Sequence, residues 1–234
     1  MTQRKNELGQ PIGFEVAGWT ARQRPPRTPM QGRYVRLEPV NADAHAADLF
    51  EAFSADKESR IWTYLPYGPF GSAAEVSDWM RKACLGDDPL FHAIIDKESG
   101  KAVGVASYLR IEPAVGVIEV GHINYAPALQ KTRGATEVMF LMMQRVFDEL
   151  GYRRYEWKCD ALNAPSCAAA KRLGFSYEGQ FRQATMYKGR NRDTNWFSIL
   201  DSEWPALKAA YEAWLNPANF DAAGVQKTSL RAGR

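Results

Sequence analysis

The sequence contains few of the residues that build disulfide frameworks or metal sites. Its cysteines and histidines are Cys84, Cys159, Cys167, His45, His92 and His122. The odd number and scattered spacing of the cysteines predict no disulfide framework. The histidines form no metal-binding spacing with the cysteines, so no metal site is expected.

Long apolar runs and a strong charge imbalance are also missing. The longest strongly apolar run covers residues 138–143, whereas a membrane-spanning helix needs about 20 residues. No signal-peptide pattern stands at the start of the sequence. The net charge of +3 is too small to indicate nucleic-acid binding by itself. We therefore expect a soluble, cytoplasmic protein without a membrane or nucleic-acid partner.

The composition is otherwise typical of a globular protein, with 45% apolar and 24% charged residues. Residues 1–32 are rich in glycine and proline and predict an extended N-terminal arm. Residues 33–201 carry the regular apolar patterns of one domain. Residues 202–234 predict a C-terminal helix followed by a tail.

Apolar periodicity within the domain predicts a mixed α/β fold. Strands are predicted at 33–40, 91–96, 102–110, 115–125, 154–159, 180–188 and 193–200. Helices are predicted at 42–53, from Ser72 onward, and at 134–150, 164–173 and 204–215. Ser72 with Glu75 forms a capping box. Antiparallel strands followed by a strand–helix–strand unit favour a mostly antiparallel sheet of six to seven strands with helices on both faces.

The segment 125–136 connects a predicted strand to the long predicted helix. A helix N-terminus offers free backbone N–H groups and the positive end of a dipole, which suit a phosphate. The residues that would contribute backbone access, charge or hydroxyl donors are Lys131, Thr132, Arg133, Gly134, Ala135 and Thr136. The same segment also fits a capped helix start with solvated basic residues. No Walker or G-x-G-x-x-G pattern is present, so a nucleotide hydrolase or dehydrogenase is not supported.

A second segment, 163–179, changes the balance between these interpretations. It has N-x-x-S at a helix start, followed by L-G-F and then E-G. With this pattern the sequence resembles the GNAT superfamily of acetyltransferases over about residues 33–204. The segment starting at Lys131 is similar to the family's pyrophosphate loop, R/Q-x-x-G-x-G/A, although Lys131 and Thr136 depart from its first and last positions. Residues 182–204 resemble the ribosomal-protein N-terminal acetyltransferase branch.

The resemblance implies a GNAT fold and an N-acetyltransferase that moves an acetyl group from acetyl-CoA to a primary amine in a ternary complex. It implies that backbone N–H groups at Ile123, Asn124 and Tyr125 bind the acetyl carbonyl, beside two splayed strands that hold the pantetheine. Asn163 would contact the pantetheine or cap its helix. Ser166 would give a proton to the leaving thiolate, and its alternative role is that of a helix-start residue.

The acceptor side has several candidate residues. Glu119, between two apolar neighbours, is the first candidate to accept the amine proton, and a solvated strand face is its alternative. An α-amine has a reference pKa of about 7.7–8.0 and needs little help from a base. His122 ranks below Glu119 as a base and is grouped with Trp62 and Tyr64 as a substrate-binding residue. Those aromatic residues can equally fill the edge of the core.

Three function classes follow from these observations. The first is an acyltransferase acting on a protein N-terminal or aminoacyl amine, and the second is a non-catalytic acyl-CoA-binding or sensor domain. The third is a nucleic-acid-associated protein that uses basic residues 182–192, which Glu178, Asp193 and the mild net charge argue against. The acceptor's identity and a homodimeric state are left open.

Overall fold

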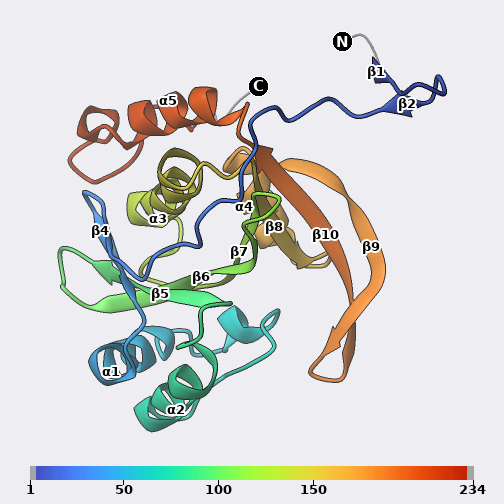
Figure 1. Cartoon of the computed structure of the whole chain (residues 1–234). Coiled ribbons are helices and arrows are strands. Elements are labelled where there is room, and N and C mark those ends of the chain that lie inside the picture. The colour runs from blue at the N-terminus through green and yellow to red at the C-terminus, as the bar shows by residue number, and fades with distance from the viewer. Residues whose placement is uncertain (1–3, 231–234) are drawn as a thin grey trace.

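The computed structural model describes residues 4–230, which are built around a strongly twisted eight-stranded sheet (Figure 1). Its strands are β3 (Met30–Gln31), β4 (Val35–Pro39), β5 (Leu90–Asp96), β6 (Ala102–Glu112), β7 (Val117–Tyr125), β8 (Arg154–Asp160), β9 (Ser176–Tyr187) and β10 (Arg190–Leu200). Their order is β3-β4-β5-β6-β7-β8-β10-β9. Only β7 and β8 pair in parallel, and all other neighbours in this sheet are antiparallel. The predicted mixed, mostly antiparallel sheet is confirmed.

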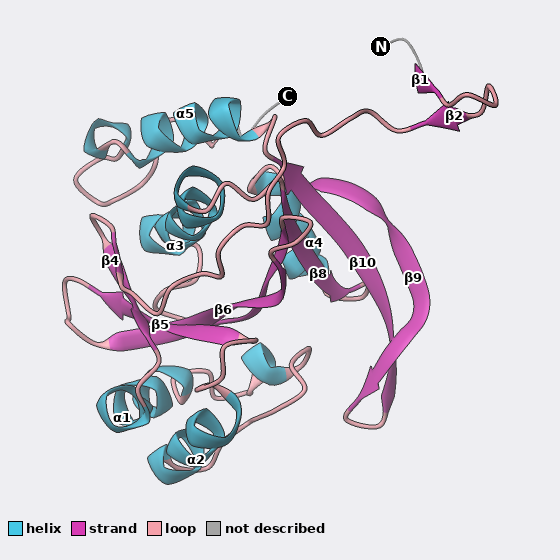
Figure 2. Ribbon diagram, viewed as in Figure 1, coloured by secondary structure: helices cyan, strands magenta, loops and turns pink. Residues whose placement is uncertain are grey.

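Helices cover both faces of the sheet (Figure 2). The helices are α1 (Ala42–Phe53), α2 (Ala73–Ala83), α3 (Arg133–Gln144), α4 (Ala164–Arg172) and α5 (Trp204–Leu215). Helices α1 and α2 share one apolar cluster with the short 3-10 helix η1 (Arg60–Trp62). Helices α3, α4 and α5 contribute to the larger cluster on the opposite face. The domain therefore has the predicted layers, with the sheet between two groups of helices.

The helix after β7 has the apolar face that its sequence predicts. Val138, Met142 and Val146 are fully buried against the sheet. The α-helical part begins at Arg133 and ends at Gln144, however, and residues 145–149 form a wider π-helical turn instead of continuing the predicted helix. This turn coincides with the buried side chain of Arg145, which donates to the main-chain oxygens of residues 28 and 29.

The strand count exceeds the prediction because very short pairings leave no periodic signal in a sequence. Two residues of the predicted arm form β3 against β4, and β1 (Arg4–Lys5) pairs with β2 (Pro11–Ile12) in a separate small hairpin.

The β9–β10 turn lies earlier in the sequence than predicted, at Lys188 and Gly189. Both residues have positive φ, 50° and 69°, which is the conformation of the two-residue turns that favour hairpins.

The second half of the arm and helix α5 both contact the domain. In the arm, Trp19 donates from Nε1 to the Ala114 oxygen at 2.8 Å, and Arg22 donates from Nε to the Gly151 oxygen at 3.0 Å. In α5, Trp204 and Tyr211 are buried in the larger apolar cluster, where both pack against Phe140 of α3. The division into arm, domain and C-terminal helix stays a prediction. Within residues 4–230, no helix combines the length and apolar character needed to cross a bilayer.

Candidate active site

The parallel strands β7 and β8 separate halfway along their length. They pair only from Val117 with Arg154 to Val120 with Trp157. Beyond that point β7 continues against β6 as far as Tyr125, and β8 continues against β10 as far as Asp160. The facing edges of both strands therefore carry main-chain groups without ladder partners, which seek other hydrogen bonds. This is the splay that the resemblance implied.

Helix α3 begins at this separated end of β7, but the hydroxyl groups near its start are used internally. The N-cap residue Thr132 accepts from the Ala135 N–H at 3.1 Å and donates to the Leu129 oxygen at 2.7 Å. Thr136 is buried, and its Oγ1 accepts from Arg172 at 3.1 Å. The Thr132 hydroxyl therefore already donates its hydrogen within the protein, which contradicts its expected role as a free donor to a phosphate. The Thr136 hydroxyl only accepts, so its predicted donation to a phosphate stays a prediction.

The remaining residues at the start of α3 have distinct surroundings. A Cβ added to Gly134 would lie 3.0 Å from Cγ1 of Val35. The missing side chain thus allows packing against β4, and the approach of an anion at this glycine stays a prediction. Arg133 stacks 4.3 Å above the Tyr34 ring, whereas Lys131 is exposed with φ +60°. The free N–H groups at the start of α3 and the exposed cation at residue 131 are features that suit a phosphate.

Helix α4 begins beside the separated end of β8. The N-cap Asn163 accepts from the Ser166 N–H at 3.1 Å, and the Ser166 hydroxyl accepts from Trp157 Nε1 at 3.0 Å. Asn163 therefore has the capping role that was one of its two predicted roles. The Ser166 hydroxyl faces β8, and its own hydrogen stays available for a further acceptor.

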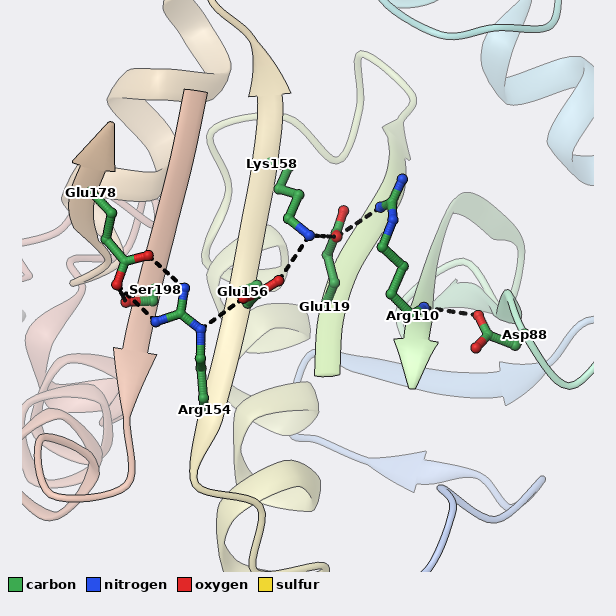
Figure 3. Close-up of polar contacts among 8 residues, drawn as sticks. All are labelled: Asp88, Arg110, Glu119, Arg154, Glu156, Lys158, Glu178 and Ser198. Atoms are coloured by element: carbon green, nitrogen blue, oxygen red, sulfur yellow. Dashed lines mark hydrogen bonds and ion pairs between the residues drawn. The ribbon is translucent and has the colours of Figure 1, made fainter. Parts of the chain in front are cut away.

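Glu119 lies at one point of a row of alternating charges (Figure 3). Its side chain is 4% exposed, and its Oε2 contacts Arg110 at 2.7 Å and Lys158 Nζ at 2.8 Å. Lys158 is itself 8% exposed and also contacts Glu156 Oε2 at 2.8 Å. The solvated strand face predicted as an alternative for Glu119 is therefore wrong, since the carboxylate is buried between the buried Lys158 and the outer Arg110.

The row continues across β8 to β9 and β10. Arg154 contacts Glu156 at 2.7 Å and forms a bidentate ion pair with Glu178. The Glu178 Oε1 also accepts from the Ser198 hydroxyl at 2.7 Å. The Arg154 guanidinium holds the pKa of Glu178 below its usual range. The sequence prediction missed this row, although charged residues alternate strictly with apolar ones along residues 154–160.

His122 occupies a bulge of β7 with φ +50°. Its ring stacks on Tyr67 with centroids 5.7 Å apart, and its Nδ1 lies 3.2 Å from the Tyr67 hydroxyl. Burial lowers the pKa of His122 to about 4, with further lowering by the positive charges of Arg110 and Arg192. The imidazole is therefore neutral at pH 7 and carries an unprotonated nitrogen.

The two aromatic residues predicted to contact substrate differ in their placement. Trp62 is 4% exposed and packs edge-on against Phe53 and Phe70 in the cluster under α1 and α2. Its predicted contact with substrate is wrong, because the indole fills the core, as the alternative stated. Tyr64 is half-buried and donates from its hydroxyl to the Leu162 oxygen at 3.0 Å, next to the separated end of β8.

Unpaired polar groups mark the separated ends of the strands. The side-chain amide nitrogen of Asn124 is buried and has no hydrogen-bond partner within the described residues. The same holds for Nε1 of Trp196 on β10. Buried donors without partners are uncommon in folded proteins and indicate a ligand or water. With the free edges of β7 and β8, these groups fit an extended amide-bearing molecule such as the pantetheine of a coenzyme.

A family model for the acetyltransferase (GNAT) domain matches residues 35–176. The chain belongs to the GNAT acetyltransferase family. The match includes the separated β7 and β8 and the starts of α3 and α4, and it ends at the first residue of β9. As a GNAT protein the chain is an N-acetyltransferase, and most of the β9–β10 hairpin lies beyond the matched domain.

Relatives agree with this assignment. A GCN5-related N-acetyltransferase from Brucella melitensis is 54% identical, with a TM-score of 0.90 over 92% of this chain and 98% of its own. A probable GNAT acetyltransferase from Chromobacterium violaceum is 43% identical, with a TM-score of 0.77 over 84% and 98%. An uncharacterized N-acetyltransferase, p20, from Bacillus licheniformis is 26% identical over 72% of this chain and 95% of its own length.

Proposed function

We propose that this protein transfers the acetyl group of acetyl-CoA to an α-amine, either a protein N-terminus or an aminoacyl compound, by direct attack in a ternary complex. The observation that carries the proposal is the separation of β7 from β8 after Val120 and Trp157. It leaves a main-chain edge beside two helix starts, and such a place can hold a thioester carbonyl and a diphosphate at once.

Acetyl-CoA supplies a thioester that an amine can attack. Backbone N–H groups of residues 123–125 would face its carbonyl oxygen, and the start of α3 with Lys131 would face its diphosphate. A structure with the same fold, the microcin C7 self-immunity acetyltransferase MccE, was solved with acetyl-CoA and AMP and is 21% identical, with a TM-score of 0.63 over 72% of this chain. Its likeness supports the fold that holds the coenzyme.

His122 is the group that we expect to receive the amine proton. Its pKa of about 4 leaves the imidazole unprotonated at pH 7 but makes it a weak base, so in the proposal it takes the proton only as the C–N bond forms and passes it on to solvent. His122 stands on the bulge of β7 three residues after Glu119. The Glu119 carboxylate already forms ion pairs with Arg110 and Lys158, so its role in the proposal is to hold these cations. As the C–N bond forms and the C–S bond breaks, the Ser166 hydroxyl donates to the leaving sulfur, and solvent returns the proton.

The proposal is tested by thiol release from acetyl-CoA with a free-amine peptide and its N-terminally blocked copy. Only the free amine should react, with a pH profile that follows the pKa of the acceptor amine because His122 is already neutral above about pH 5. His122→Gln should lower kcat by about tenfold or more, and Glu119→Gln by less. Acetyl-CoA should also raise the Tm. A Tm rise without thiol release from any free amine would instead identify an acyl-CoA-binding domain.

A further inference from the structure

The tip of the β9–β10 hairpin brings basic side chains to the side of the sheet that carries η1 and His122. This side is called the acceptor side, because the proposed amine acceptor would bind there. The hairpin curves away from the other strands toward the side of α1 and α2 (Figure 1). Lys188 donates from Nζ to the Trp62 oxygen at 2.9 Å, and Arg190 donates to the Thr63 oxygen at 2.7 Å. These two bonds connect the hairpin tip to η1, and both positive charges face uncharged main-chain oxygens.

Arg192 follows on the same strand and is half-buried. Its Nε donates to the Thr194 hydroxyl at 3.2 Å, and its guanidinium carbon lies 6.0 Å from the centre of the Tyr187 ring. Within residues 4–230, neither Arg192 nor the two cations of the tip forms an ion pair with a carboxylate. A half-buried guanidinium without a counter-charge is electrostatically unsatisfied.

Three carboxylates of the neighbouring strands and of the hairpin contact groups other than Arg192. Asp160 accepts from the Tyr187 hydroxyl at 2.7 Å and from the Leu162 N–H at 2.8 Å. Asp193 accepts from the Gln183 N–H at 2.8 Å and from side chains of its own hairpin. Glu119 holds two other cations. Asp160 and Asp193 keep their negative charges, because the groups that donate to them are neutral, but neither carboxylate forms an ion pair with Arg192. Arg192 therefore has no direct counter-charge among the described residues.

The positive charge of Arg192 also acts on His122, the proposed proton acceptor. Arg110 on β6 and Arg192 on β10 both contribute to the lowered pKa of His122, so both guanidinium groups lie within electrostatic range of the imidazole. An amine bound there feels the same field, which favours its neutral, reactive form. The field also attracts any negative group that the acceptor carries.

We propose that the acceptor carries an anionic oxygen group, a carboxylate or a phosphate, close to its amine, and that Arg192 binds this group. The proposal rests on the acetyl transfer proposed above and names the chemical class of its acceptor. A guanidinium presents donors in a fixed fork that matches carboxylate and phosphate oxygens. The hairpin lies largely outside the matched family domain, which is consistent with a role in choosing the acceptor.

The test uses four peptides that differ only at their second residue: Asp, phosphoserine, Asn and Lys. With the wild-type enzyme, kcat/KM should be about tenfold or more higher for an acidic peptide than for the Asn peptide, the effect of one charge-assisted hydrogen bond. The Asp and phosphoserine peptides show which oxygen group is preferred. Arg192→Gln should remove this preference, and Arg192→Lys should keep part of it.

Arg182→Gln is the matched control, because it removes the same charge from an exposed position of β9. It should leave the preference and the activity unchanged. Equal rates for the acidic and Asn peptides would overturn the proposal. A loss of the acetyl-CoA-induced Tm rise in Arg192→Gln would also overturn it, by assigning Arg192 to the coenzyme phosphates. If no peptide is acetylated at all, the acetyl transfer itself fails, and this inference falls with it.

Discussion

The two faces of strand β8 bury their side chains by different means. On one face Tyr155, Trp157 and Cys159 are at most 6% exposed and lie in the apolar cluster under α3 and α4. On the other face Glu156 and Lys158 are nearly as buried but are surrounded by opposite charges. The apolar face gains stability from the area that it removes from water, whereas the charged face stays folded only while every charge keeps its partner.

This difference assigns different tasks to the two faces. Apolar packing is non-directional, so it holds the helices against the sheet without fixing the register of neighbouring strands. The ion pairs are directional and connect β6, β7, β8 and β9 through Arg110, Glu119, Lys158, Arg154 and Glu178. They lie directly before the point where β7 and β8 separate, so they set the register of the two strands beside the proposed acetyl site.

The largest effect is expected on the apolar face. Tyr155→Ala should lower the free energy of unfolding by about 3–5 kcal/mol, because it removes a fully buried ring that packs against Tyr108, Phe147 and Phe175. Tyr155→Phe should be neutral, since the hydroxyl is buried without a partner in the described structure. Urea unfolding measures both. An equal loss for the two variants would show that the hydroxyl, and not the ring, holds this face.

A smaller effect is expected on the charged face. Lys158→Met should cost about 3 kcal/mol because it leaves Glu119 and Glu156 buried without their shared cation. Adding Glu119→Gln and Glu156→Gln should recover most of this loss in urea unfolding. Lys101→Met, at the exposed pair with Glu51, is the control and should leave the midpoint unchanged. Failure of the triple variant to recover would show that Lys158 acts through packing on Trp196.

The apolar side of the sheet also contains a titratable group, His92, and this predicts a dependence of stability on pH. Burial, aided by the charge of Arg145, lowers its pKa to about 3, against about 6.5 when unfolded. Below pH 6.5 the His92 imidazole is protonated in the unfolded chain but stays neutral in the folded protein. The free energy of unfolding should therefore fall as the pH falls from 6.5 toward 3.

The contribution of His92 amounts to about 2 kcal/mol at pH 5, and His122, with its pKa of about 4, acts in the same direction. Urea unfolding at a series of pH values measures the sum. The variant His92→Leu should flatten the curve between pH 6.5 and 4. A curve parallel to that of the wild type would mean that His92 becomes charged inside the folded protein.

Much of the fold could be predicted because its signals are local. Period-two alternation predicted the strand at residues 154–159, and the structure has Tyr155, Trp157 and Cys159 on the apolar face of that strand. The 3.6-residue period placed the apolar face of α3. The early part of β9 gave no such signal, because most of the strand is exposed, and residues 179 and 183 interrupt it with positive φ.

The candidate site was predictable only where a motif marks it. The patterns around Gly134 and Ser166 pointed to the starts of α3 and α4, but they could not reveal that Thr132 and Thr136 already have protein partners. The charged row and the unpaired Arg192 depend on which strands become neighbours across the sheet. Such pairings join residues far apart in the chain, and no local pattern specifies them.

The connection between the hairpin tip and η1 has a consequence for directed evolution. Lys188 and Arg190 bind the main-chain oxygens of residues 62 and 63, and every amino acid has such an oxygen. A combinatorial library at the exposed residue 63 can therefore vary its side chain while the hairpin stays attached. The attachment of the hairpin to η1 is thus independent of the side chain at residue 63.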